Sequence, residues 1–99
     1  MRLERLLAWM AEQEFPALVD SGLLREVEEI VVEGHRTVHE RGGRPWSRPD
    51  AYRWLRYEDP VPVRRLIDGV ERLRREAVEF DADAVDKACV RASEMGFLN

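Results

Sequence analysis

The sequence predicts an all-α protein, a small bundle of four to five helices that forms a single domain over residues 1–99. Apolar residues recur in steps of three and four along most of the chain, which is the spacing of one helix face. Prolines and glycines, the residues that start and stop helices, separate these stretches. A chain of 99 residues has room for one core, and 44% hydrophobic with 36% charged residues is typical of helices with solvated outer faces.

The first helix is predicted from the N-terminus to about Glu14. It should end there because Phe15 precedes Pro16, and a residue before proline is biased away from helical angles. Pro16 then suits the first turn of a short segment that ends at Asp20 and is closed by Ser21-Gly22. The buried face of the first helix is predicted at Leu3, Leu6, Leu7 and Met10.

Residues 23–40 allow two interpretations. One helix is favoured, because the apolar residues keep the same period on both sides of Gly34. The alternative is a short β-hairpin over about 30–38, in which the β-branched residues form the strands and Glu33-Gly34 forms the turn. A glycine inside a helix costs about 1 kcal/mol relative to alanine, so Gly34 and Gly69 predict a close helix crossing at one or both.

Two further helices are predicted in the second half of the chain. A short one starts at Ser47, which can cap it, and runs to about Tyr57. A long one covers about 62–80 and is expected to be the spine of the bundle, with the first helix and the 23–40 helix packed against it. Its buried face is predicted at Val63, Leu66, Ile67, Val70, Leu73, Ala77 and Phe80.

The last helix is predicted to begin after Asp81 or Asp83, either of which can cap it. Gly96 stands where a left-handed C-terminal cap is expected, with Phe97 placed to make the accompanying apolar contact. The buried face of this helix is predicted at Val85, Ala88, Cys89, Ala92 and Met95.

Charge is distributed unevenly along the chain. The segment Arg41–Arg65 holds seven arginines against three acids, whereas residues 1–40 hold four basic and nine acidic groups and residues 66–99 hold five against eight. An acidic protein of net charge −4 therefore has one basic middle, in which aromatic residues alternate with the arginines. The candidate partner-binding residues are Arg44, Trp46, Arg48, Tyr52, Arg53, Trp54 and Arg56.

Three interpretations of this arginine and aromatic segment stay open. The aromatic residues can be core anchors of the short helix, with the arginines paired to neighbouring acidic helices. Arginine and large rings are also enriched at protein–protein hot spots. Finally, arginines pair with phosphates and rings stack on bases in nucleic-acid binders, although a pI of about 5.2 is not that of a typical duplex-DNA-binding domain.

The other candidate sites each have a plainer interpretation. His35 and His39 are four residues apart and could share a metal on a helix, but no second histidine or cysteine cluster completes the site, so a solvated helix end is favoured. The acidic run Glu26, Glu28, Glu29 and Glu33 could hold magnesium in a hydrolase, but a solvated face is favoured. Cys89 has no histidine in its own helix to activate it and is expected in the core.

The expected function is a non-enzymatic interaction or regulatory module, such as an adaptor, that binds a protein partner through the arginine and aromatic surface. A nucleic-acid-binding protein that uses the same residues is the alternative, and a metal-dependent hydrolase is the third hypothesis. No cofactor and no bound metal are expected. A cytoplasmic protein is expected, because no stretch is long and apolar enough for a membrane span and the N-terminal apolar run, which contains an acid, is not typical of a signal peptide. Fifteen arginines against one lysine suggest a GC-rich genome, so a bacterial or phage source is expected. A homodimer fits the small size of the core.

Overall fold

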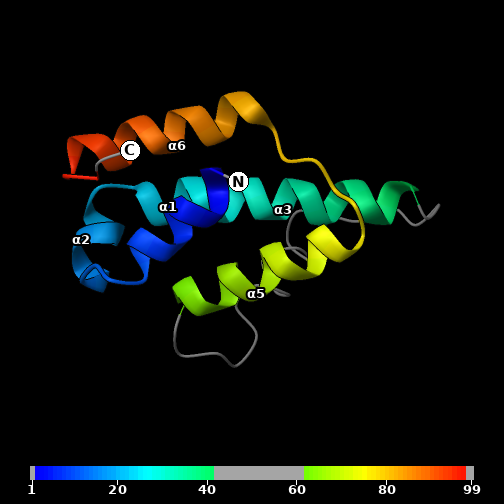
Figure 1. The fold of residues 1–99 in the computed structure, drawn as a ribbon, viewed down its shortest axis with the longest axis horizontal. Helices are drawn as coiled ribbons and strands as arrows, with labels where there is room; N and C mark the ends of the chain where they lie inside the picture. The colour runs from blue at the N-terminus through cyan, green and yellow to red at the C-terminus, as the bar shows by residue number, and fades with distance from the viewer. Residues whose placement is uncertain (1, 42–61, 98–99) are drawn as a thin grey trace.

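A computed structural model of the protein describes residues 2–41 and 62–97. These residues form five helices and no strand (Figure 1), which confirms the all-α prediction. Residues 23–40 belong to one continuous helix, so the hairpin alternative is wrong. The predicted helix from Ser47 to Tyr57 lies outside the described residues. The helices are α1 (Arg2–Met10), α2 (Phe15–Asp20), α3 (Leu23–Arg41), α5 (Pro62–Arg75) and α6 (Ala82–Glu94).

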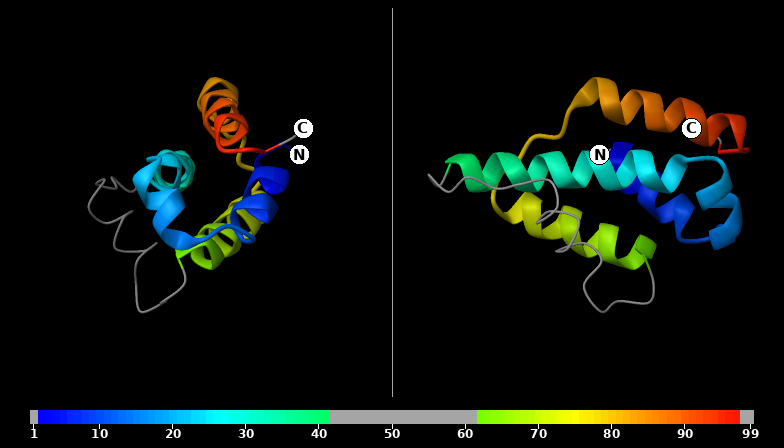
Figure 2. Two further views of the ribbon diagram at one scale, coloured as in Figure 1. Left: turned by 90° about the vertical axis from the view of Figure 1, so that its left-hand side faces the viewer. Right: turned by 180° about the vertical axis from the view of Figure 1, so that it is seen from behind.

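Four helices, α1, α3, α5 and α6, surround the core of the protein, and each of them packs against two of the others. α3 packs against α5 and α6, and α1 packs against the same two helices from the opposite side. Figure 1 shows α5 and α6 on the two sides of α3, and the end-on view in Figure 2 separates α3 from α1. α2 packs against α3 and covers the end at which α3 begins. Apolar side chains from all five helices therefore meet in one core.

The central helix of the bundle is α3, not α5 as the sequence suggested. α5 contacts α1 and α3 as expected, but α3 packs against α2, α5 and α6. Because neighbours reach α3 from several sides, its buried face is wider than a single stripe. That face consists of Leu23, Leu24, Val27, Glu28, Ile30, Val31, Val32, Gly34 and His35.

The first two helices differ slightly from their predicted limits. α1 ends at Met10, four residues before Glu14, and a turn over residues 11–13 follows it. Phe15 lies inside α2 although it precedes proline, and Glu14, with extended backbone angles, is the N-cap residue. The predicted closure at Ser21-Gly22 is confirmed, since both backbone N–H groups donate to carbonyls of α2. Leu3, Leu6, Leu7 and Met10 are all buried.

α5 is shorter than the predicted 62–80 helix. It ends at Arg75, and Ala77 adopts left-handed backbone angles with a φ of 58°. The Ala77 N–H donates to the Arg74 carbonyl at 2.9 Å, and the Val78 N–H donates to the Leu73 carbonyl at 3.1 Å. This pair of bonds is the Schellman arrangement that closes a helix. Residues 76–81 therefore form a connection that carries the chain back to α3.

α6 has the caps that the sequence predicted at both ends. One carboxylate oxygen of Asp81 accepts hydrogen bonds from the N–H groups of Asp83 at 2.9 Å and Ala84 at 3.2 Å. At the other end, Gly96 has a φ of 108°. Phe97 is buried there, with its ring centroid 5.4 Å from that of Trp9. Val85, Ala88, Cys89 and Ala92 are buried, and Met95 is partly buried, as predicted.

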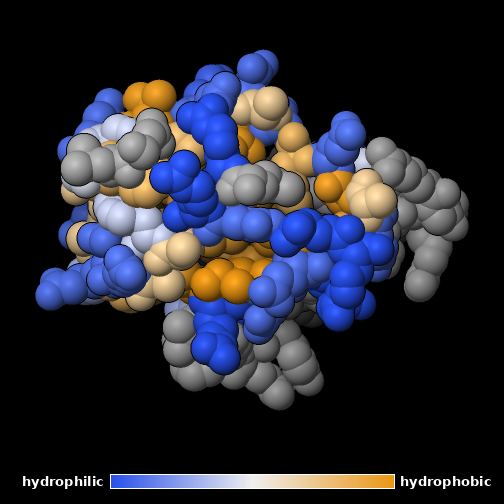
Figure 3. Space-filling view, in the orientation of Figure 1, coloured by the Kyte–Doolittle hydropathy of each residue, from blue (hydrophilic) through white to orange (hydrophobic). Residues whose placement is uncertain are grey.

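The face of the molecule drawn in Figure 3 carries both hydrophilic and hydrophobic residues. On the face shown in Figure 3, hydrophobic atoms appear in patches between charged side chains. Within residues 2–41 and 62–97, no helix combines the length and the apolar character that crossing a membrane requires.

Candidate functional site

The predicted arginine and aromatic surface lies outside the described residues. Arg44, Trp46, Arg48, Tyr52, Arg53, Trp54 and Arg56 all fall between residues 42 and 61. Their assignment as a partner-binding surface therefore stays a prediction.

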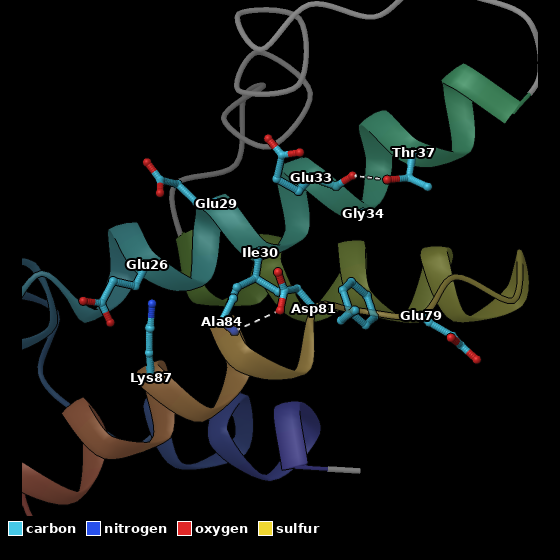
Figure 4. Close-up of a pocket in the computed structure, with 11 residues that line it drawn as sticks. Glu26, Glu29, Ile30, Glu33, Gly34, Thr37, Glu79, Asp81, Ala84 and Lys87 are labelled. Carbon is cyan, nitrogen blue, oxygen red and sulfur yellow. Dashed lines mark hydrogen bonds between the residues drawn. The ribbon is translucent and has the colours of Figure 1, made fainter.

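Within the described residues, a groove of about 700 Å³ runs along α3. Its other wall is made by the connection before α6 and by the first half of α6 (Figure 4). The α3 wall extends from Glu26 to Thr37, a length of about 16 Å at 1.5 Å per residue. The connection can reach α3 because α5 has already ended at Arg75.

The floor of the groove is apolar and closely packed. Ile30 and Ala84 line it from the two helices, together with Gly34 and the partly buried Phe80. A Cβ atom on Gly34 would lie 3.0 Å from Phe80 Cε1 and 3.2 Å from Leu73 Cδ1. Glycine at position 34 therefore allows the Phe80 ring, from the connection after α5, and the Leu73 side chain of α5 to approach the backbone of α3.

Three glutamates form the α3 rim of the groove. Glu26, Glu29 and Glu33 are three and four residues apart, so they follow one side of the helix. The Glu33 carboxylate accepts from Arg36 Nη2 at 2.7 Å and from Arg36 Nε at 3.0 Å. Figure 4 shows the Glu29 and Glu33 carboxylates turned away from α6, at the outer edge of the groove.

The opposite rim carries two acids and one lysine. Glu79 and Asp81 are exposed, and Asp81 is fixed in place by its role as the cap of α6. Lys87 lies two turns further along α6, near Glu26 at the far end of the groove (Figure 4). Five carboxylates and one ammonium thus surround an apolar floor, so the lining of the groove is acidic.

The four glutamates of the acidic run do not share one solvated face in the structure. Glu28 is only 4% exposed, so its placement on a solvated face is wrong, whereas Glu26, Glu29 and Glu33 line the groove. Glu28 lies on the buried face of α3 and does not line the groove. Among residues 2–41 and 62–97, no three His, Cys, Asp or Glu side chains gather closely enough to hold a metal ion.

The interpretation of His35 as part of a solvated helix end is also wrong. His35 is 5% exposed, and it follows Glu28 by seven residues along the same side of α3. It therefore belongs to the buried face of α3 although it is a polar residue. The side chain of His39 lies outside the described residues. Cys89 is buried among core residues of α6, as predicted.

Sequence reasoning missed the α6 side of the groove. Phe80 was assigned to the core stripe of a longer helix, and Lys87 had no predicted role. The sequence signal that could have revealed the groove was Gly34, which marks a close approach but does not say which residue approaches. The sequence also gave no indication that α5 ends at Arg75, because the left-handed position after this helix is occupied by Ala77 and not by a glycine.

No protein-family model, no curated protein and no solved structure matches this chain.

Proposed function

We propose that this protein is a non-enzymatic interaction module that binds a protein partner, and that the groove between α3 and α6 holds a partner segment bearing arginine or lysine. The groove itself carries the proposal, because it combines a concave apolar floor with an acidic rim. A sequence-specific partner segment needs both features, one for affinity and one for register.

The charge of the rim selects for a cationic segment. Glu79 and Asp81 are exposed on one side, and Glu29 and Glu33 keep 45% and 38% of their side chains exposed on the other. Glu29 and Glu33 contact Arg25 and Arg36, and their carboxylates add negative charge to this rim. An anionic partner would meet like charge along both walls, so complementarity favours a basic one.

The apolar floor contributes affinity that charge alone does not supply. Exposed ion pairs are each worth at most about 1 kcal/mol, so charges on the rim give weak and salt-sensitive binding without further contacts. Burial of one aliphatic side chain on the floor can add about 1.5–3 kcal/mol. The groove is about 16 Å long, which matches about five residues of extended chain or eleven residues of helix.

The arginine and aromatic segment remains part of this proposal as a second binding surface. This segment is basic and would bind an acidic surface of a partner, whereas the acidic groove would bind a basic one. A second copy of this chain offers basic residues of the kind that the groove favours, so self-association is one outcome that the experiment must separate from binding to another protein.

The test uses a labelled twelve-residue peptide with four arginines and two leucines, and the same peptide with glutamate in place of arginine. Binding is measured by fluorescence anisotropy at physiological salt. The groove variant is Glu29→Gln/Glu79→Gln/Asp81→Asn, in which asparagine keeps the α6 cap. We expect the arginine peptide to bind the wild type and to lose about tenfold or more in affinity with this variant, at up to about 1 kcal/mol per removed charge.

A matched control removes three exposed acids away from the groove, Glu12→Gln/Asp20→Asn/Asp68→Asn, with the same change in net charge. We expect this control to lose less than about twofold. Equal losses in both variants, or equal binding of the glutamate peptide, would contradict the proposal. A dimer of the wild type in sedimentation that becomes monomeric in the groove variant would assign the groove to a second copy instead.

A further inference from the structure

Phe80 is an aromatic residue on the floor of the groove, and it stands between two acids in the chain. Glu79 and Asp81 are its direct neighbours in the sequence, both are exposed, and all three residues line the groove. Phe80 is only partly buried against the core, so part of its ring is accessible from the groove. An aromatic ring beside carboxylates attracts a cation in two ways, because the ring face is negative and the acids are charged.

The position of the Phe80 ring is fixed by the residues on both sides of it. Val78, two residues earlier, is 5% exposed, and Asp81, the next residue, is held as the cap of α6. The ring meets α3 along one edge, since the ring atoms nearest to a Cβ on Gly34 would be Cε1 at 3.0 Å and Cδ1 at 3.4 Å. A ring that is already in place loses little freedom when a ligand stacks on it.

The Asp81 carboxylate has one oxygen left for a partner. Its Oδ1 atom accepts hydrogen bonds from the N–H groups of Asp83 and Ala84, which use the two lone pairs of that oxygen. A guanidinium group that binds Asp81 therefore lacks the second free oxygen of the usual bidentate pair with a carboxylate. The charge of Asp81 attracts arginine and lysine alike, so at this point of the groove a preference between them depends on the ring.

We infer that Phe80 is a specificity-determining residue, and that it selects arginine over lysine in the partner segment. The guanidinium group is planar and weakly hydrated, so it stacks on an aromatic ring, whereas the ammonium of lysine is compact and strongly hydrated. In the inferred arrangement the guanidinium lies on the Phe80 ring and donates to Oδ2 of Asp81. The inference rests on the proposed function and narrows it, because a groove that only needs a basic segment would accept either cation.

The test compares two peptides of equal charge, the arginine peptide described above and the same peptide with lysine at all four arginine positions. We expect the wild type to bind the arginine peptide about two- to fivefold more tightly, which is the range of one exposed cation–π contact. Phe80→Leu should bind the two peptides equally, because leucine keeps the floor apolar but removes the ring. Asp81→Asn should weaken both peptides by a similar factor and keep their order.

A spectroscopic measurement on the wild type tests the contact without any variant. Protons above an aromatic ring are shielded by its ring current, so the δ-methylene protons of the bound arginine peptide should shift upfield in proton NMR spectra. The shift should be absent with Phe80→Leu. The control variant is Phe15→Leu, the same substitution at a half-exposed residue of α2, a helix that does not line the groove. It should keep both the upfield shift and the preference for arginine.

Circular dichroism and urea denaturation establish that each variant is folded before its binding is compared. If the lysine peptide binds the wild type as tightly as the arginine peptide, or if folded Phe80→Leu keeps the preference for arginine, the inference is overturned and the proposed function stands. An arginine peptide that binds the wild type without an upfield shift would also overturn it. If neither peptide binds the wild type, both the inference and the proposed function fail.

Discussion

Ala77 is the residue at which local backbone energy matters most. It adopts a φ of 58°, in the left-handed region that costs an L-residue with a Cβ about 1–2 kcal/mol. α6 ends with the same pattern of hydrogen bonds, but there Gly96 takes the left-handed position. The closure of α5 is therefore held by tertiary contacts, since Leu73 and Val78 are both buried beside it.

Replacing this residue by glycine should stabilise the protein. We expect Ala77→Gly to raise the free energy of unfolding by about 0.5–1 kcal/mol, because the relief of strain exceeds the entropy that glycine adds to the unfolded chain. The measurement is the midpoint of urea denaturation. The control is Ala8→Gly at an exposed position inside α1, which should lower stability by about 0.5–1 kcal/mol. A loss of stability in Ala77→Gly would mean that the left-handed cap is not strained.

The structural role of a single residue can be predicted from the sequence when its type is one that the role favours. Asp81 caps α6 and Gly96 closes it, and both roles were evident because aspartate and glycine are the residues that such positions favour. Ala77 has no such preference, so its role was hidden. His35 and Glu28 are buried against the usual preference of their types, because the surroundings of α3 decide their exposure.

At the scale of helices, the contact between α3 and the chain after α5 defines the groove. Gly34 allows Phe80 and Leu73 to lie against α3, and Leu73 is 1% exposed, so it has no room to withdraw. The period of apolar residues identified both helices, but it did not identify which residue fills the space over Gly34. That information depends on how the two helices are placed relative to each other.

The variant Gly34→Ala should therefore be destabilising although alanine favours a helix. The gain in helix propensity is about 1 kcal/mol, and overpacking costs about 1–3 kcal/mol, so we expect a net loss of about 1 kcal/mol in urea denaturation. In the background of Phe80→Ala, the same change should cost less, because the nearest atom is gone while Leu73 Cδ1 still lies 3.2 Å from the added Cβ. An equal effect of Gly34→Ala in both backgrounds would show that Phe80 does not restrict this position.

For the whole molecule, the main functional alternative is nucleic-acid binding by the basic middle of the chain. We expect fluorescence anisotropy with single- and double-stranded oligonucleotides to show no salt-dependent binding, because the net charge is −4 and the groove is acidic. The comparison is with Arg48→Ala/Arg53→Ala/Arg56→Ala, after circular dichroism has shown that this variant folds.

Binding that falls with salt at a slope of about −0.7 per phosphate contact for single strands, or about −0.9 for duplex, would change this assignment. If the folded arginine variant also lost that binding, nucleic-acid binding would replace protein binding as the function of the segment. Retained binding in the variant would place the contact on other residues.

The sequence by itself determined the helical class, the position of most helices in the described chain and the caps of α6. These features follow from interactions between residues close together in the chain, such as a side chain and the first turn of its own helix. Only the tertiary structure decided that α3 is central, that Glu28 and His35 are buried, and that Phe80, Asp81 and Lys87 line the same groove as glutamates of α3. The groove joins residues that are more than forty positions apart in the chain, and helical periodicity carries no information on which faces meet.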